Sequence, residues 1–105
     1  MTFIIVFSTC ANKGEAEKIA RELLKHRFAA CVNILPIISF YWWKDKIRKG
    51  SEFLLVIKTR HKLFLQLKRR ISSLSSYEVP EITSVKIDDG LSSYLKWIDE
   101  ETGAK

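Results

Sequence analysis

The side chains best suited to metal binding or nucleophilic chemistry are two cysteines and two histidines, and they are scattered along the chain. Cys10 and Cys31 do not form a CxxC pair, and His26 and His61 each stand between a lysine and an arginine. A copper or zinc site needs several thiolate or imidazole ligands that converge on one point, and cationic neighbours disfavour a metal ion. We therefore expect reduced thiols, two surface histidines and a small core residue at Cys31.

The sequence contains few motifs that would support catalysis or nucleic-acid binding. No Ser/His/Asp or Cys/His arrangement for nucleophilic catalysis is visible. The segment 10–14 has one glycine and no arginine, so it is a poor phosphate cradle. The segment 52–59 carries only Phe53 where an RNA-binding sheet would display several aromatics. The net charge of +6 is spread along the chain, which is typical of a basic solvated surface. The sequence therefore predicts neither an enzyme nor a nucleic-acid partner.

Hydrophobic periodicity indicates the elements that must position these side chains. Continuous apolar runs favour strands, and apolar stripes at i, i+3 and i+4 favour helices. The pattern predicts strands at 3–9, 28–43, 52–59 and 79–87, and helices at 13–26, 61–74 and 91–101. Asn12 is a good helix N-cap, and Glu15 has the spacing of a capping box. Pro36 must lie at an edge or a bulge and is expected to bend its strand.

The order of these elements defines a fold. Strand, helix, strand, strand, helix, strand and helix make up an α+β, ferredoxin-like split βαβ: βαββαβ plus a C-terminal helix. The polar segment 44–51, which contains Gly50, is expected to form a long hairpin between the second and third strands. Right-handed crossovers place both main helices on one face of the sheet. The 105 residues make one domain, 1–105.

The segment 28–43 predicts that the chain assembles with itself. It is apolar at successive positions and ends in Phe40, Tyr41, Trp42 and Trp43. Such a strand needs cover on both faces, whereas the two main helices cover one. We expect other copies of the chain to cover the second face. No signal peptide or transmembrane span is visible, so a cytoplasmic location without membrane insertion is expected.

Five motifs resemble one family. They are AACVNILP at 29–36, FYWWKDKI at 40–47, Glu52 followed by VIKT at 56–59, YEVPEI at 77–82 and YLKWI at 94–98. In this order and spacing they are similar to the CutA family of divalent-cation tolerance proteins. The resemblance covers residues 4–101, nearly the whole chain. It implies a ferredoxin-like fold in a homotrimer similar to the PII signalling proteins, cytoplasmic in bacteria, with a role in tolerance of copper and other divalent metals.

The resemblance also implies two kinds of site. The family's metal ligands are a thiol near the end of the first strand, matched by Cys10, and a histidine before the YEVPEI motif, where this chain has Ser75 and Ser76. A divalent ion such as Cu or Zn is the expected cofactor, bound without catalysis. Six further residues fall at family motif positions that would line clefts between subunits: Trp43, Lys46, Glu52, Lys58, Tyr77 and Glu81. The alternative function is a PII-like trimeric signalling or scaffold protein that binds a small anion there.

Overall fold

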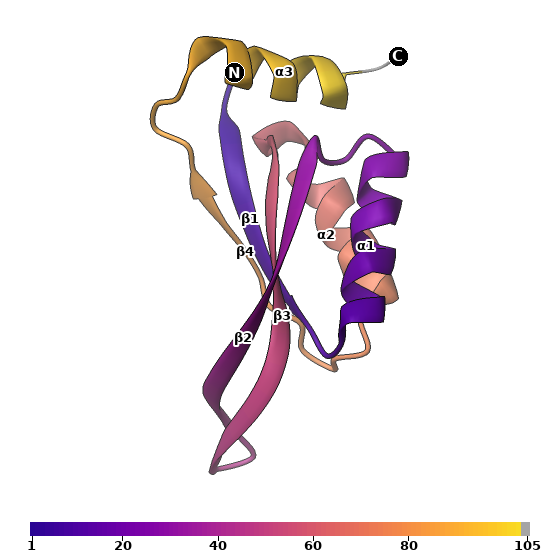
Figure 1. Ribbon diagram of the computed structural model, residues 1–105, viewed down its shortest axis with the longest axis vertical. Helices are drawn as coiled ribbons and strands as arrows, with labels where there is room; N and C mark the ends of the chain where they lie inside the picture. The colour runs from indigo at the N-terminus through magenta and orange to yellow at the C-terminus, as the bar shows by residue number, and fades with distance from the viewer. Residues whose placement is uncertain (104–105) are drawn as a thin grey trace.

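The computed structural model describes residues 1–103, which form four strands and three α-helices (Figure 1). The single domain predicted at 1–105 therefore extends two residues beyond the described part. The elements are β1 (Phe3–Cys10), α1 (Lys13–Lys25), β2 (Cys31–Trp43), β3 (Lys46–Arg60), a 3-10 turn η1 (His61–Leu63), α2 (Phe64–Leu74), β4 (Ile82–Lys86) and α3 (Ser92–Thr102).

The sheet has the strand order β2-β3-β1-β4, and all three pairs of neighbouring strands are antiparallel. This order follows from two βαβ units that interleave, so that β1 and β3 lie at the centre. Figure 1 shows α1 and α2 on the same face of the sheet, while α3 crosses one end of it. The predicted α+β fold of ferredoxin-like topology is confirmed.

The core fills the space between the sheet and the two main helices. Alternate residues of β1 point toward the helices, so Ile4, Val6 and Cys10 are buried, and Leu55 and Ile57 of β3 join them. Helix α1 contributes its apolar stripe Ala16, Ile19, Ala20 and Leu23. Its N-cap is as predicted: Asn12 Oδ1 accepts a hydrogen bond of 2.8 Å from the backbone N–H of Glu15.

The hairpin differs from the prediction at its turn. The turn consists of Lys44 and Asp45 alone, with φ of 50° and 63°, and Trp43 pairs with Lys46. Positive φ at both central residues defines the turn that matches strand twist, although neither residue is a glycine. The glycine at position 50 misled the prediction, because Gly50 lies inside β3 and the ring of Tyr41 lies close to it.

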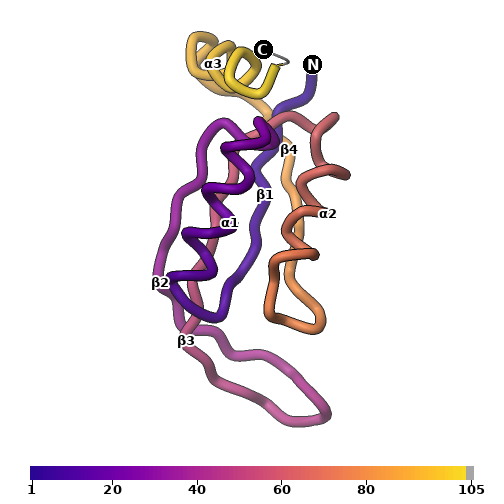
Figure 2. The backbone as a smooth tube through the Cα atoms, turned by 90° about the vertical axis from the view of Figure 1, so that its right-hand side faces the viewer, coloured from indigo at the N-terminus to yellow at the C-terminus, as the bar shows by residue number. Residues whose placement is uncertain are grey.

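Pro36 lies at the sheet edge as expected, but it forms no bulge. Strand β2 is the edge strand, and its register with β3 runs unbroken from Cys31–Lys58 to Trp43–Lys46. Figures 1 and 2 show the β2–β3 hairpin projecting well beyond the helices. At the other edge, β4 begins at Ile82 rather than at the predicted residue 79, so residues 79–81 remain outside the sheet.

The second face of the sheet, which we call the open face, carries no helix from this chain. Its central residues are Ile5, Phe7, Leu54 and Val56, and all four are partly exposed. Cys31 also lies on this side, opposite Lys58, and is partly exposed. The expectation that Cys31 belongs to the core is therefore wrong, because the strand pleat directs it away from α1 and α2.

Candidate functional site

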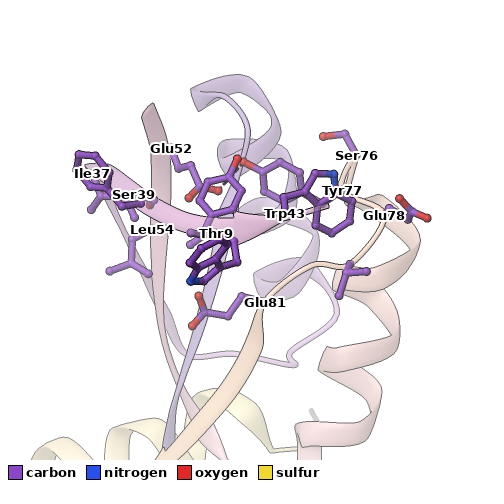
Figure 3. Close-up of a pocket in the computed structure, with 14 residues that line it drawn as sticks. Thr9, Ile37, Ser39, Trp43, Glu52, Leu54, Ser76, Tyr77, Glu78 and Glu81 are labelled. Atoms are coloured by element: carbon purple, nitrogen blue, oxygen red, sulfur yellow. Dashed lines mark hydrogen bonds between the residues drawn. The ribbon is translucent and has the colours of Figure 1, made fainter. Parts of the chain in front are cut away.

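One hollow of the described residues lies on the open-face side of the hairpin, and we call it the hairpin cleft. Its volume is about 720 Å³, within the range of ligand pockets. One wall is the distal part of β2 and β3, and the other is the segment 76–81 before β4 (Figure 3). The lining comprises Thr9, Ile37, Ser39, Phe40, Tyr41, Trp42, Trp43, Glu52, Leu54, Ser76, Tyr77, Glu78, Val79 and Glu81.

Two hydrogen bonds hold the segment 76–81 in place as a wall of the hairpin cleft. The hydroxyl of Tyr77 donates to Glu52 Oε2 at 2.6 Å and so joins the segment 76–81 to β3. The backbone N–H of Ser76 donates to Glu15 Oε1 at 2.6 Å, which joins the same segment to α1. Burial and the carboxylate of Glu52 raise the pKa of the Tyr77 phenol, so at neutral pH it keeps the proton that it donates.

The electrostatic character of the hairpin cleft is acidic. Three carboxylates line it, those of Glu52, Glu78 and Glu81, and the lining among the described residues includes no Lys, Arg or His. None of the ion pairs formed within the described chain involves these three carboxylates. A protein with a net charge of +6 thus concentrates negative charge at one aromatic hollow. This arrangement suits a cation and opposes the small anion considered from the sequence.

Four of the six predicted cleft residues come together here. Trp43, Glu52, Tyr77 and Glu81 all line the hairpin cleft. The two lysines do not. Lys46 follows the hairpin turn, and Lys58 lies near the other end of β3, where its ammonium group bonds to Asn33.

Ten further lining residues were not singled out from the sequence as site residues, and four of these are aromatic or charged. They are Phe40, Tyr41, Trp42 and Glu78. The three aromatics were interpreted as assembly surface. Glu78 lies inside the YEVPEI motif, so membership of that motif was the signal that could have identified it as a site residue.

Cys10, the predicted metal ligand, lies in the core at the end of β1. Its side chain is 1 % exposed and belongs to the cluster between sheet and helices. Burial first, and then the charges of Glu15 and Glu52, raise the pKa of the Cys10 thiol to about 11. A metal ion binds the thiolate, so it must displace this proton. Among residues 1–103, no group of three or more His, Cys, Asp and Glu side chains converges as a metal site. Metal binding at Cys10 stays a prediction.

The Cys10 thiol should make the protein less stable in alkali. In the unfolded chain it loses its proton near its ordinary pKa of 9.0, whereas in the folded chain it keeps the proton to about pH 11. Its contribution to stability is therefore complete below pH 9 and is lost as pH rises toward 11. Chemical denaturation at pH 8 and pH 10.5 should show that the wild type loses about 2 kcal/mol more than Cys10→Ala. Equal losses in the two proteins would contradict the buried, protonated thiol.

The fold and site together define a class of protein: a ferredoxin-like α+β domain with a long hairpin and an acidic aromatic cleft. The sequence of residues 4–101 matches the model of the CutA1 divalent ion tolerance protein family. The chain is 42% identical over 95 residues to the divalent-cation tolerance protein CutA of Archaeoglobus fulgidus, covering 90% of this chain and 93% of that protein. With its Pyrococcus horikoshii counterpart it shares 43% identity over 99 residues, 94% and 97% of the two chains. The chain belongs to the CutA1 divalent ion tolerance family.

Solved structures agree with this assignment. A CutA structure from A. fulgidus superposes with a TM-score of 0.95 at 40% identity, over 96% of this chain and 99% of that one. CutA1 from Oryza sativa gives a TM-score of 0.95 at 36% identity, over 100% and 97% of the two chains. The A. fulgidus and P. horikoshii relatives are named for tolerance of divalent cations, and that name describes no catalytic reaction. Within residues 1–103, no helix is long and apolar enough to cross a membrane.

Proposed function

We propose that this chain is a homotrimeric, non-catalytic protein that binds a divalent metal ion such as Cu²⁺ or Zn²⁺ and so contributes to metal tolerance. Membership of the divalent ion tolerance family is the observation that carries the proposal. The open face supports the trimer, because Ile5, Phe7 and Val56 form a partly exposed apolar centre without a helix over it. Copies of the chain packed on this face would give it a second layer.

The proposed metal ligand is the Cys10 thiolate, completed by groups that assembly brings to it. The charges of the Glu15 and Glu52 carboxylates raise the pKa of the thiol, but the three groups do not converge as a metal site within the described residues of one subunit, so the further ligands would come from other subunits. A bound cation would reverse the effect of the two carboxylates and favour the thiolate. Metal affinity should therefore rise with pH, because binding releases the thiol proton.

The test is calorimetric titration of the intact protein with Zn²⁺ and with Cu²⁺. We expect saturable binding that is lost in Cys10→Ser. The matched control is Cys31→Ser, because Cys31 is the second free thiol and faces the open side of the sheet. Binding that persists in Cys10→Ser, or no saturable heat in the wild type, would overturn the proposed ligand.

We propose the cytoplasm as the compartment. Both cysteines are free thiols in the described structure, which suits a reducing environment. The A. fulgidus relative is described as a periplasmic protein, so location can differ within the family. Fractionation of the source cells, with antibody detection of the chain, decides between the two compartments.

A further inference from the structure

We propose that the outer surface of α1 and α2, which we call the helix face, is a docking surface for a linear phosphate polymer such as inorganic polyphosphate. The proposal goes beyond metal binding at Cys10 and does not depend on it. It rests on three properties of the helix face: the cations that the fold gathers there, the engagement of its carboxylates, and its position on the side of the sheet away from the open face.

The fold gathers cations that are dispersed along the sequence. Helix α1, turn η1 and helix α2 carry eight Lys and Arg side chains and three Glu side chains, whereas the segment 77–103 carries seven Asp and Glu side chains and two Lys side chains. The two helices and the turn thus hold a surplus of five positive charges in a chain whose net charge is +6. The spread of this charge along the sequence indicated only a basic solvated surface, but the fold concentrates it in one layer.

The cations of α1 point away from the core. Lys18, Arg21 and Lys25 are spaced i, i+3 and i+7, and all three are exposed. The buried stripe that contains Ile19 and Leu23 occupies the opposite side of the helix. Seven residues of helix separate Lys18 from Lys25, which places their backbones about 10 Å apart along the helix axis.

Helix α2 extends the cationic surface beside α1. Figures 1 and 2 show the two helices next to each other, and Arg70 Nη1 joins them by an ion pair of 3.4 Å with Glu22 Oε1. Lys62 and Arg69 are exposed, and Arg69 lies on the side of α2 opposite the buried Leu67. Packed helices lie about 8–10 Å apart, and the Debye length is about 10 Å in 0.1 M salt. The potentials of cations on the two helices therefore add.

The carboxylates of α1 are already engaged. Glu17 pairs with Arg21 at 3.5 Å, Glu22 pairs with Arg70, and Glu15 accepts hydrogen bonds from two backbone N–H groups. Several exposed cations of the two helices and the turn form no ion pair and lie over no ring within residues 1–103: Lys13, Lys18, Lys25, Lys62 and Arg69. Their charge is therefore available to an anionic partner.

The position of the helix face favours a flexible polymer over a flat membrane. The proposed trimer packs on the open face, which is the other side of the sheet, so α1 and α2 would stay on the outside of the assembly (Figure 1). Three helix faces would then point in different directions around the axis. A planar membrane could meet only one of them at a time, whereas a flexible polyanion can pass from one subunit to the next and gain from their linkage.

The side chains of the helix face favour phosphate groups over nucleic-acid bases. Bases are bound by stacking on exposed aromatic rings. The exposed aromatics of the described residues lie on the hairpin and on α3 instead: Phe40, Tyr41, Trp42, Tyr94 and Trp97. Lysine and arginine side chains bind phosphate oxygens through charge and hydrogen bonds, without reading a base. A phosphate chain that carries no bases therefore matches this surface.

The experiment measures fluorescence anisotropy of an end-labelled linear polyphosphate with the intact protein, in a chelator that removes divalent ions. We expect saturable binding that weakens at least about tenfold between about 50 and 200 mM salt, because counterions are released on binding. The variant Lys18→Gln/Arg69→Gln should bind at least about tenfold more weakly at the lower salt concentration and depend less steeply on salt.

The matched control is Arg48→Gln/Lys96→Gln. It removes the same two side-chain types from exposed positions on the hairpin, the other cationic region of the chain, and on α3. This control should bind polyphosphate as the wild type does, and sedimentation checks that both double variants assemble as the wild type does. Equal weakening in the two variants would show a response to net charge alone and would overturn the helix face as the site. Absence of salt-sensitive binding in the wild type would do the same.

Three further titrations fix the identity of the partner. Single-stranded oligo(dT) that binds more tightly than polyphosphate would make the helix face a nucleic-acid surface and overturn the proposed polymer. Preferred binding to phosphatidylserine vesicles would make it a membrane surface and overturn the polymer equally. Cys10→Ser should bind polyphosphate with wild-type affinity, so that failure of the metal site and failure of the helix face are observed separately. Loss of polyphosphate binding in Cys10→Ser would contradict a site on the helix face.

Discussion

Replacing Val56 by aspartate is expected to convert the protein from a trimer to a monomer of 12.2 kDa, the mass of one chain. Val56 lies at the centre of the open face, between Phe7 of β1 and Asn33 of β2. In a trimer packed on this face, three carboxylates would be taken out of water at once. The effective penalty is several kcal/mol for each ion, so association should weaken by about a thousandfold or more. Sedimentation at micromolar concentration measures the result.

The same substitution should leave the subunit fold intact, because Val56 points away from the core and water reaches it in the free chain. Circular dichroism checks this point. The control is Ser72→Asp, which adds the same charge on the exposed surface of α2 and should sediment as the wild type does. Since assembly stabilises the folded state by mass action, the Tm of the wild type should rise with protein concentration and that of Val56→Asp should not. A monomeric wild type, or a trimeric Val56→Asp, would contradict the proposed interface.

The fold could be predicted from the sequence largely because its signals are local and repeated. Periods in the apolar pattern located all four strands and the three α-helices of the described chain, though not all of their ends, and the order of elements fixed the topology. The errors arose where local chemistry is ambiguous. The Lys44–Asp45 turn contains no glycine from which it could be predicted, whereas Gly50 belongs to a strand. Val79 resembles the start of a strand, yet residues 79–81 lie outside the sheet, because Tyr77 and Ser76 hold the segment before β4 to β3 and α1.

The site was predictable in part. Motif positions identified Trp43, Glu52, Tyr77 and Glu81, which the fold brings to one hollow from three separate segments. The negative charge of the site was not predictable, because it depends on how far apart along the strands the charged side chains lie. Lys58 falls in the same family motif set as Glu52 and points to the same face, but six residues of extended strand separate them. The burial of Cys10 likewise depends on how α1 packs, which periodicity alone does not specify.

Replacing Arg60 by methionine is expected to destabilise the protein by about 3 kcal/mol and to release α3 from the sheet. The guanidinium of Arg60 is buried, with a residue exposure of 7%. Its Nε donates to Thr102 Oγ1 at 2.8 Å, and its Nη2 donates to the Thr102 carbonyl oxygen at 2.8 Å. Methionine keeps most of the aliphatic stem but leaves the buried hydroxyl and carbonyl oxygens of Thr102 without these donors. The nearby Asp99 contributes little, because its carboxylate is 43% exposed and 3.6 Å away.

The matched control for this prediction is Arg27→Met. Arg27 also holds α3, through the carbonyl and the carboxylate of Glu101 at 3.1 and 2.9 Å, but its side chain is 47% exposed. Water can replace its bonds, so the loss should stay below about 1 kcal/mol. Urea denaturation measures both losses, and hydrogen exchange should show faster exchange of the α3 amides in Arg60→Met only. If the two variants lost equal stability, burial of the Arg60–Thr102 bonds would not be what anchors α3, and the two arginines would share that role.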